Sequence, residues 1–153
     1  MAKPTVDKLT PEGQRFLAEI EKLKTLKVKI GFQQGKEQED DGTDVCEIAL
    51  WNELGTSSTP SRPFMRDAVD NHEEEINKFL DNQFKLLALG KTNAETMMKS
   101  IGVYLKGLVQ AEIVDGSFTP NAPSTIKRKK SDKPLIDTGT MRQSVNYVVV
   151  DKK

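Results

Sequence analysis

The sequence has little of what most catalytic and metal centres require. Its 153 residues include one cysteine, Cys46, and one histidine, His72. A single thiol cannot form an internal disulfide, and these two residues cannot supply the four ligands of a Cys/His zinc site. Gly31 and Gly35 are too isolated to form a phosphate-binding loop. The composition therefore excludes disulfide scaffolds, Cys/His zinc modules and P-loop folds, and it predicts no cofactor.

Long apolar runs are also absent. No segment approaches the roughly 18 apolar residues that a membrane helix needs. The start of the chain, MAKP, lacks the apolar core of a signal peptide. We therefore expect a soluble protein in the cytoplasm of the cell that makes it, without a membrane partner. The length predicts one domain, residues 1–153, and the 36% of hydrophobic residues predicts a thin core.

A net charge is absent because 23 Lys and Arg balance 23 Asp and Glu, but the charges are segregated. Residues 36–47 carry six acids and one base, and residues 66–81 carry six acids and two bases. Residues 121–153 carry eight bases and three acids, a net charge of +5. Solvated faces are the commoner cause of such runs, but oppositely charged regions could also meet between copies of the chain.

Apolar periodicity and turn residues predict the elements. We expect helices over residues 11–26, 44–54 and 64–89, a helix opening at Thr92, and a helical turn from Ser124 to Lys130. Strands are expected near residues 27–33 and 143–151, paired with each other, and residues 134–141 are expected to form a turn. Residues 1–9 should be flexible, residues 33–43 form an acidic loop, and residues 115–133 form an extended loop with a basic run. The predicted class is α+β: a small, mostly antiparallel sheet packed against a long helical hairpin and shorter helices.

Candidate catalytic residues have simpler explanations. His72 lies on the apolar stripe of the long helix, where a core or interface histidine is more common than a base. Cys46 lies in the first turn of a short helix, which favours a small, partly buried residue over a nucleophile. A hydrolase using His72 or Cys46 stays open as an alternative that would need those side chains beside a pocket.

The basic run is the clearest electrostatic feature, and it comprises Lys127, Arg128, Lys129, Lys130 and Lys133. Such a run can contact phosphates, but it lacks interleaved aromatic residues and a known recognition helix. A charged protein interface is favoured over contact with nucleic acid, and a solvated loop is the remaining explanation.

Two blocks are more specific than periodicity. Residues 51–56 read WNELGT, residues 60–66 read PSRPFMR, and residues 133–145 read KPLIDTGTMRQSV. These blocks resemble the patterns W-N-E-x-G-T, P-x-R-P-F-x-R and K-P-L-x-D-T-G-x-L-R-x-S-I of the tail-completion, or head-to-tail joining, proteins of tailed bacteriophages, in the group of HK-type siphophage tail components. The resemblance covers about residues 25–150. Met141 replaces the usual Leu, and Ser61 stands where a small apolar residue is common.

The resemblance implies a non-enzymatic structural protein of the virion, placed at the head–tail interface or the tail end, and in the host cytoplasm during assembly. It implies a homo-oligomeric ring, a hexamer in the virion, that contacts the tail tube or tail terminator and neck or connector proteins. The alternative is a DNA-contacting neck or packaging factor that uses the basic run.

Physical chemistry assigns structural tasks to most of these residues. Gly55 can end the short helix, Phe64 can fill the core, and Arg62 and Arg66 can bind nearby carboxylates or carbonyls. The residues expected to determine the fold are Trp51, Glu53, Gly55, Pro63, Phe64, Arg66, Asp137, Thr138 and Gly139. The residues expected at an interface, with the link 56–62, are Glu37, Glu39, Asp40, Asp41, Arg62, Lys127, Arg128, Lys129 and Lys130.

Overall fold

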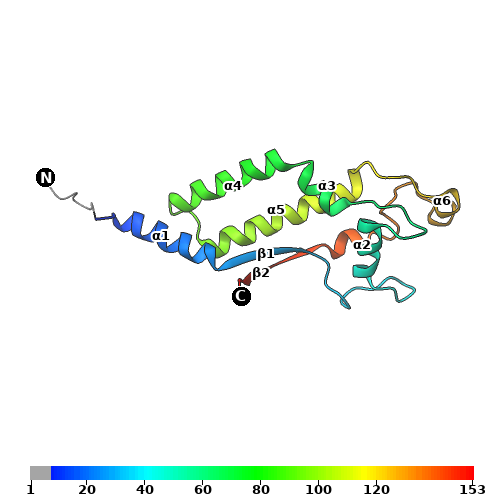
Figure 1. Cartoon of the computed structure of the whole chain (residues 1–153), viewed down its shortest axis with the longest axis horizontal. Helices are drawn as coiled ribbons and strands as arrows, with labels where there is room; N and C mark the ends of the chain where they lie inside the picture. Colours follow the sequence, from blue (N-terminus) through cyan, green and yellow to red (C-terminus); the bar gives the residue numbers. More distant parts are fainter. Residues whose placement is uncertain (1–7) are drawn as a thin grey trace.

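The computed structural model describes residues 8–153, so most of the predicted flexible segment 1–9 lies outside the described residues. The described chain is elongated (Figure 1). Its elements are α1 (Pro11–Lys24), β1 (Leu26–Gly31), α2 (Val45–Leu54), α3 (Phe64–Asp70), α4 (Glu73–Ala88), α5 (Ala94–Asp115), α6 (Pro123–Lys129), α7 (Thr140–Ser144) and β2 (Asn146–Asp151).

The predicted α+β class is confirmed, and the two predicted strands pair with each other. β1 and β2 form an antiparallel pair in which Leu26 lies opposite Asp151 and Gly31 lies opposite Asn146. One face of this sheet packs on α5. Tyr147 lies so close to Gly102 of α5 that a Cβ atom there would stand 2.2 Å from the tyrosine Cδ2. The absence of a side chain at Gly102 therefore sets how closely the sheet approaches the helix.

The helical hairpin is formed by α4 and α5, which lie side by side and are joined by a short turn (Figure 1). The rings of Phe79 and Tyr104 stack between them with centroids 4.1 Å apart. α1 holds the turn of the hairpin with one base and one acid. Arg15 donates to the last carbonyls of α4, those of Leu87 and Ala88, and Glu19 accepts from the first amide of α5 at 2.6 Å. The positive charge of Arg15 lies at the negative C-terminal end of the α4 dipole, and the negative charge of Glu19 lies at the positive N-terminal end of the α5 dipole. Both interactions are favourable and stabilise the turn.

The predicted helix over residues 64–89 is interrupted. α3 ends at Asp70, His72 has non-helical backbone angles of −122° and 21°, and α4 begins at Glu73. Asp, Asn and His are weak helix formers, and three consecutive glutamates favour a new helix N-terminus. The apolar stripe continues across the break, so periodicity alone could not reveal it.

Three smaller expectations also differ from the structure. Asn93, not Thr92, caps α5, since its side chain accepts from the Thr96 amide at 2.9 Å. Ala122, not Ser124, is the cap position of α6, which begins at Pro123 because proline suits the first helical position. Residues 140–144 form the short helix α7, which overlaps the end of the predicted turn 134–141 and the start of the strand predicted near 143–151, so β2 begins only at Asn146.

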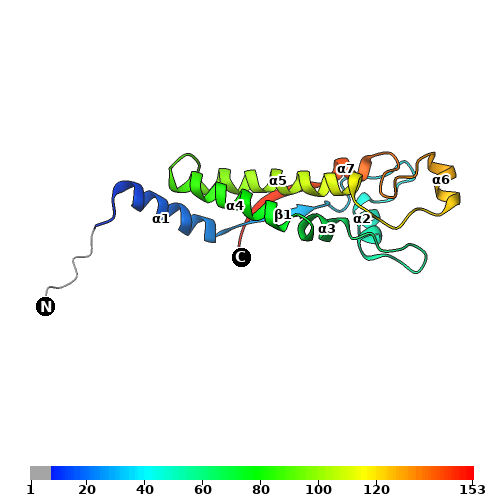
Figure 2. The ribbon, with the colours of Figure 1, turned by 90° about the horizontal axis from the view of Figure 1, so that it is seen from above.

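The molecule divides into two regions that we name by their elements. The body comprises α1, α3, α4, α5 and the two strands, and α3 connects it to α2. The pocket end comprises α2, α6, α7 and the loops around them, and Figure 2 shows these elements together at one end of the long axis. The core lies where the two regions meet, and its buried members are Val45, Ala49, Phe64, Ala68, Val109, Ile113, Leu135, Met141 and Val145.

Candidate functional site

The first sequence block forms α2 and the start of α3, and it is held by its own polar side chains. Asp44 caps α2 by accepting from the Cys46 amide at 2.9 Å. Gly55 ends α2 with a positive φ of 77°, and a Cβ atom there would lie 2.8 Å from the Ser61 amide nitrogen. The predicted helix end at Gly55 is therefore confirmed, and a larger residue would push the following link away.

Glu53 has a role that the sequence did not specify. Pro63 precedes α3 and offers no side-chain cap, so the first amides of that helix need another partner. The Glu53 carboxylate accepts from the amides of Met65 and Arg66 at 2.9 and 3.2 Å. A glutamate at the end of one helix thus caps the next helix and fixes the angle between them.

Arg62 is the polar centre of this end. Its side chain is only 5% exposed, and burial lowers its pKa. It donates to the carbonyls of Thr119 and Pro120 at 2.8 and 3.3 Å, and to the side chains of Asn121 and Asn52 at 3.2 and 3.4 Å. The prediction that Arg62 binds carbonyls is confirmed, but its guanidinium is enclosed by its own chain and does not lie on an outer surface.

The remaining residues of the first block differ in their burial and in their contacts. Phe64 is fully buried and packs edge-on against Phe32 with centroids 6.0 Å apart, which confirms the predicted core position. The Arg66 guanidinium makes no hydrogen bond or ion pair within residues 8–153, although its backbone amide is capped by Glu53. Trp51 remains 44% exposed on α2, so packing does not support a fold-determining role for its side chain.

The second block also lies at the pocket end and packs into the same core as the first block. Leu135, Met141 and Val145 fill the core. Gly139 takes a positive φ of 84° just before α7. The Thr138 hydroxyl accepts from the Thr140 amide at 3.3 Å and lies 3.0 Å from the Glu39 carboxylate of the acidic loop. The predicted turn at Gly139 is confirmed, and Thr138 in addition links this turn to the acidic loop.

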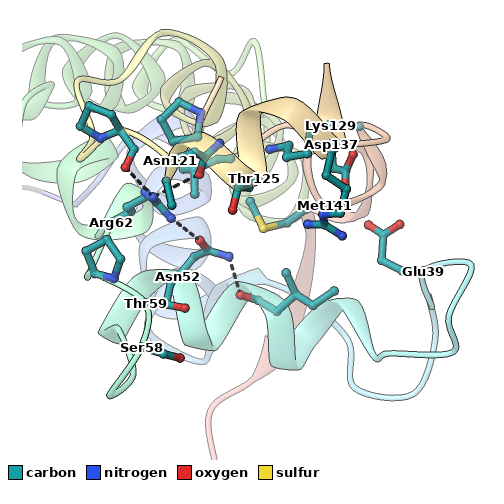
Figure 3. Close-up of a pocket in the computed structure, with 18 residues that line it drawn as sticks. Glu39, Asn52, Ser58, Thr59, Arg62, Asn121, Thr125, Lys129, Asp137 and Met141 are labelled. Atoms are coloured by element: carbon teal, nitrogen blue, oxygen red, sulfur yellow. Dashed lines mark hydrogen bonds between the residues drawn. The ribbon is translucent and has the colours of Figure 1, made fainter. Parts of the chain in front are cut away.

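The two blocks meet around a pocket of about 340 Å³ (Figure 3). Asn52 and Arg62 of the first block form part of its wall, and Leu135, Asp137, Gly139 and Met141 of the second block face them. Glu39 of the acidic loop and Arg128 and Lys129 of the basic run complete the wall. Segments that are far apart in the sequence are therefore brought to one site.

The charges around the pocket partly compensate each other within one chain. Burial lowers the pKa of Lys129, and the nearby charge of Asp137 partly offsets that effect. The pKa of Asp41 lies below its usual value, mainly because Thr43 donates hydrogen bonds to its carboxylate, with a smaller contribution from Arg128. Since the acidic loop and the basic run already lie side by side, their opposite charges do not by themselves call for a second copy.

The remaining interface candidates are accessible. Glu37, Asp40 and Asp41 are exposed in the acidic loop, and Glu39 is half-buried against Thr138. In the basic run the exposed residues are Lys127, Arg128 and Lys130, whereas Lys129 is half-buried and donates to the carbonyl of Lys133 at 3.0 Å. These side chains can meet a partner at the pocket end, with the exception of the enclosed Arg62.

Sequence reasoning missed an apolar surface on α2. Leu50, Trp51 and Leu54 are 54%, 44% and 62% exposed, and the helical repeat places them on one face. The opposite face of α2 carries the buried Val45 and Ala49. The sequence contained a signal for this surface, because α2 has more apolar residues than one buried face can accommodate. An exposed tryptophan with two leucines is typical of a docking surface.

The candidate catalytic residues do not form a catalytic group. His72 lies at the junction of α3 and α4, where its Nδ1 is 2.7 Å from a Glu75 oxygen and its Nε2 is 3.8 Å from a Glu112 oxygen. No hydroxyl or thiol is bonded to it within residues 8–153. Cys46 lines a separate, smaller pocket of about 140 Å³, and its thiol faces the Phe32 carbonyl. His72 lines another pocket, of about 370 Å³. Each of the two side chains therefore lies beside a pocket, as the hydrolase alternative requires, but the two pockets share no lining residue.

Residues 8–153 also lack two other features. They contain no cluster of three or more His, Cys, Asp or Glu side chains with the geometry to hold a metal ion. None of the helices between these residues combines the length and apolar character of a membrane span.

Comparison of the chain with protein-family models, with curated protein sequences and with solved structures gives no match.

Proposed function

We propose that this chain is a non-enzymatic structural protein of a tailed bacteriophage that completes the tail or joins the tail to the head. It acts in the virion, at the neck or the upper end of the tail, after assembly in the host cytoplasm. It forms a homo-oligomeric ring, and the pocket end docks on virion neighbours, which are the tail tube or tail terminator and the neck or connector proteins.

The observation that carries this proposal is the meeting of the two sequence blocks. The blocks that resemble tail-completion proteins are separated by about seventy residues, yet they share the core and enclose one pocket. Residues that resemble a family pattern only by chance have no reason to converge in space. Their convergence, through the shared core and the pocket wall, supports the interpretation of the blocks as one structural unit.

The chemistry of the pocket end favours docking over catalysis. The guanidinium of the buried Arg62 is bonded to oxygens of its own chain, so its contacts stiffen the loops around the pocket. Beside the pocket, the exposed face formed by Leu50, Trp51 and Leu54 offers apolar area for a protein partner. The acidic loop and the basic run then supply a polar rim that selects the orientation of the partner.

Deletion of the gene from the phage or prophage that encodes it tests the proposal, with restoration in trans as the control. Electron microscopy of the lysates should show separate filled heads and tails, or tails of abnormal length, and restoration should return intact particles. Intact infectious particles from the deletion lysate would reject a joining or completion role.

A DNA-contacting neck or packaging factor is the second candidate. It is favoured by the exposed side chains of Lys127, Arg128 and Lys130 at the tip of the pocket end. This function requires duplex binding that weakens steeply as the salt concentration rises. Equal binding by wild type and by a Lys127→Glu, Arg128→Glu, Lys130→Glu variant would exclude it.

A further inference from the structure

The sheet has one face that no helix covers and that is partly exposed. In the antiparallel register, Val28 and Ile30 lie opposite Val149 and Tyr147, and this set faces α5. The alternate residues therefore point away from α5, and they include Lys27, Lys29, Val148 and Val150. Val148 is 49% exposed and Lys29 is exposed, whereas Lys27 and Val150 are half-buried. Neither lysine forms an ion pair within residues 8–153. The outer sheet face is thus an apolar centre beside two uncompensated positive charges.

An isolated pair of strands is marginal in water and needs further strands or packing against a helix. Here α5 supplies that packing on one face only. The helices cover only the face on α5, since α4 contacts α1, α3 and α5 but neither strand. A second copy or another protein on the outer face would complete the packing of the sheet.

The opposite side of the body carries the complementary surface. The corner between α3 and α4 exposes Asp70, Glu73 and Glu74 around Val69, which is itself 49% exposed. Of these acids only Glu74 has an ion-pair partner in the described part of the chain, Lys78 at 3.8 Å. The corner therefore has the same plan as the outer sheet face, an apolar centre beside uncompensated charge, with the opposite sign.

The two surfaces lie on opposite sides of α5. Figure 1 shows α4 on one side of α5 and the strands on the other. Different surfaces that meet between copies form a head-to-tail contact, and such contacts generate rings when the rotation closes. The acidic loop and the basic run do not offer this arrangement, because both lie at one end of the molecule.

We propose that the outer sheet face, centred on Val148 with Lys27 and Lys29, binds the α3–α4 corner of a second copy, centred on Val69 with Asp70, Glu73 and Glu74. This interface rests on the proposed ring function and specifies how the ring forms. It separates self-association, through the body, from docking to virion neighbours, through the pocket end.

Charge reversal on each surface tests the interface, with the purified chain and sedimentation equilibrium as the assay. A Lys27→Glu, Lys29→Glu variant should raise the dissociation constant of self-association about tenfold or more. A variant with Asp70→Lys, Glu73→Lys and Glu74→Lys should do the same. Association of the wild type should also weaken as salt rises, because the charges are exposed.

Mixing the two variants distinguishes a lost contact from a misfolded chain. The reversed sheet face of one variant is complementary to the reversed corner of the other, and the unchanged surfaces remain complementary, so the mixture should associate like wild type. A Lys127→Glu, Lys130→Glu variant is the matched control, because it makes the same charge change at the pocket end and should leave association unchanged.

Three results would overturn the interface: a wild-type chain that stays monomeric, unchanged association of the sheet-face variant, or a mixture that fails to associate. These results are independent of the deletion phenotype. Separate heads and tails after deletion, together with no effect of the reversals, would retain the tail function and reject this interface. If association depends on these charges but virions remain normal after deletion, the interface is retained and the tail function is rejected.

Discussion

The body and the pocket end of this molecule are stabilised by different kinds of contact. In the body, regular elements pack along their length, and Gly102 and the stacked pair Phe79–Tyr104 show how closely they approach. At the pocket end, much of the chain is loop, and a few buried polar groups hold it. Arg62 ties together segments 57–59 residues apart in the sequence. We therefore expect the pocket end to loosen locally and the body to unfold as a unit.

The largest effect is expected where the two regions meet. Phe64→Ala removes a fully buried ring from the shared core and should lower the free energy of unfolding by about 3–5 kcal/mol. Chemical denaturation followed by circular dichroism measures this change. The control is Phe84→Ala, because Phe84 is 44% exposed on α4 and its loss should be small. Equal losses for the two variants would mean that Phe64 is not a core residue.

Arg62→Ala should destabilise the pocket end and leave the body unchanged. The carbonyls of Thr119 and Pro120 lose a charged donor, which should cost about 1.5–3 kcal/mol. Hydrogen exchange should quicken in residues 52–62 and 117–122, while α5 and the strands keep their protection. Arg66→Ala is the matched control, since that guanidinium has no partner within residues 8–153. Uniform loss of protection along the chain would refute a local role for Arg62.

Gly102→Ala tests the packing of the body. The new methyl group would overlap the Tyr147 ring, so we expect a loss of about 1–3 kcal/mol from overpacking. Gly107→Ala on the same helix meets no atom within 4 Å and should stabilise the chain instead. Thermal unfolding distinguishes the two variants. Adding Tyr147→Ala should abolish most of the Gly102→Ala penalty, and additive effects would show that the two residues do not touch.

The smallest effect is expected at the exposed pair of Lys22 and Glu95, whose charged atoms are 3.0 Å apart. Hydrogen bonding and charge from Lys22 lower the pKa of Glu95 below its ordinary 4.5. The pair therefore stabilises the fold above that pH, and its contribution disappears as the pH falls through the lowered pKa. Glu95→Gln should reduce stability slightly at pH 7 and not at all in strong acid. A difference from wild type that persists in acid would contradict this assignment.

Much of the body could be predicted from the sequence. Apolar periodicity located α1, both strands and the helical hairpin, because each buries one face at a regular spacing. The break at His72 was not predicted, because the stripe of apolar residues runs through it. The contacts of Arg15 and Glu19 with the hairpin were not predicted either, because they join residues more than seventy positions apart.

The pocket end was less predictable for the same physical reason. The blocks could be seen in the sequence, but nothing local shows that Arg62 faces residues 119–121 or that Glu53 caps α3. The acidic loop and the basic run are about ninety residues apart, so their closeness around one pocket depends on the whole fold. Local patterns therefore predicted the elements, and long-range contacts decided which surfaces are free.

The most direct test of this account is to restore the deleted gene with a chain that carries Leu50→Ser, Trp51→Ser and Leu54→Ser. This variant loses the apolar face of the pocket end and keeps the body. We expect a folded chain that associates like wild type, with separate filled heads and tails in the lysate. A Leu17→Ser, Leu89→Ser variant, changed at exposed leucines of the body, should restore intact particles. Intact particles in both cases would contradict docking through the pocket end.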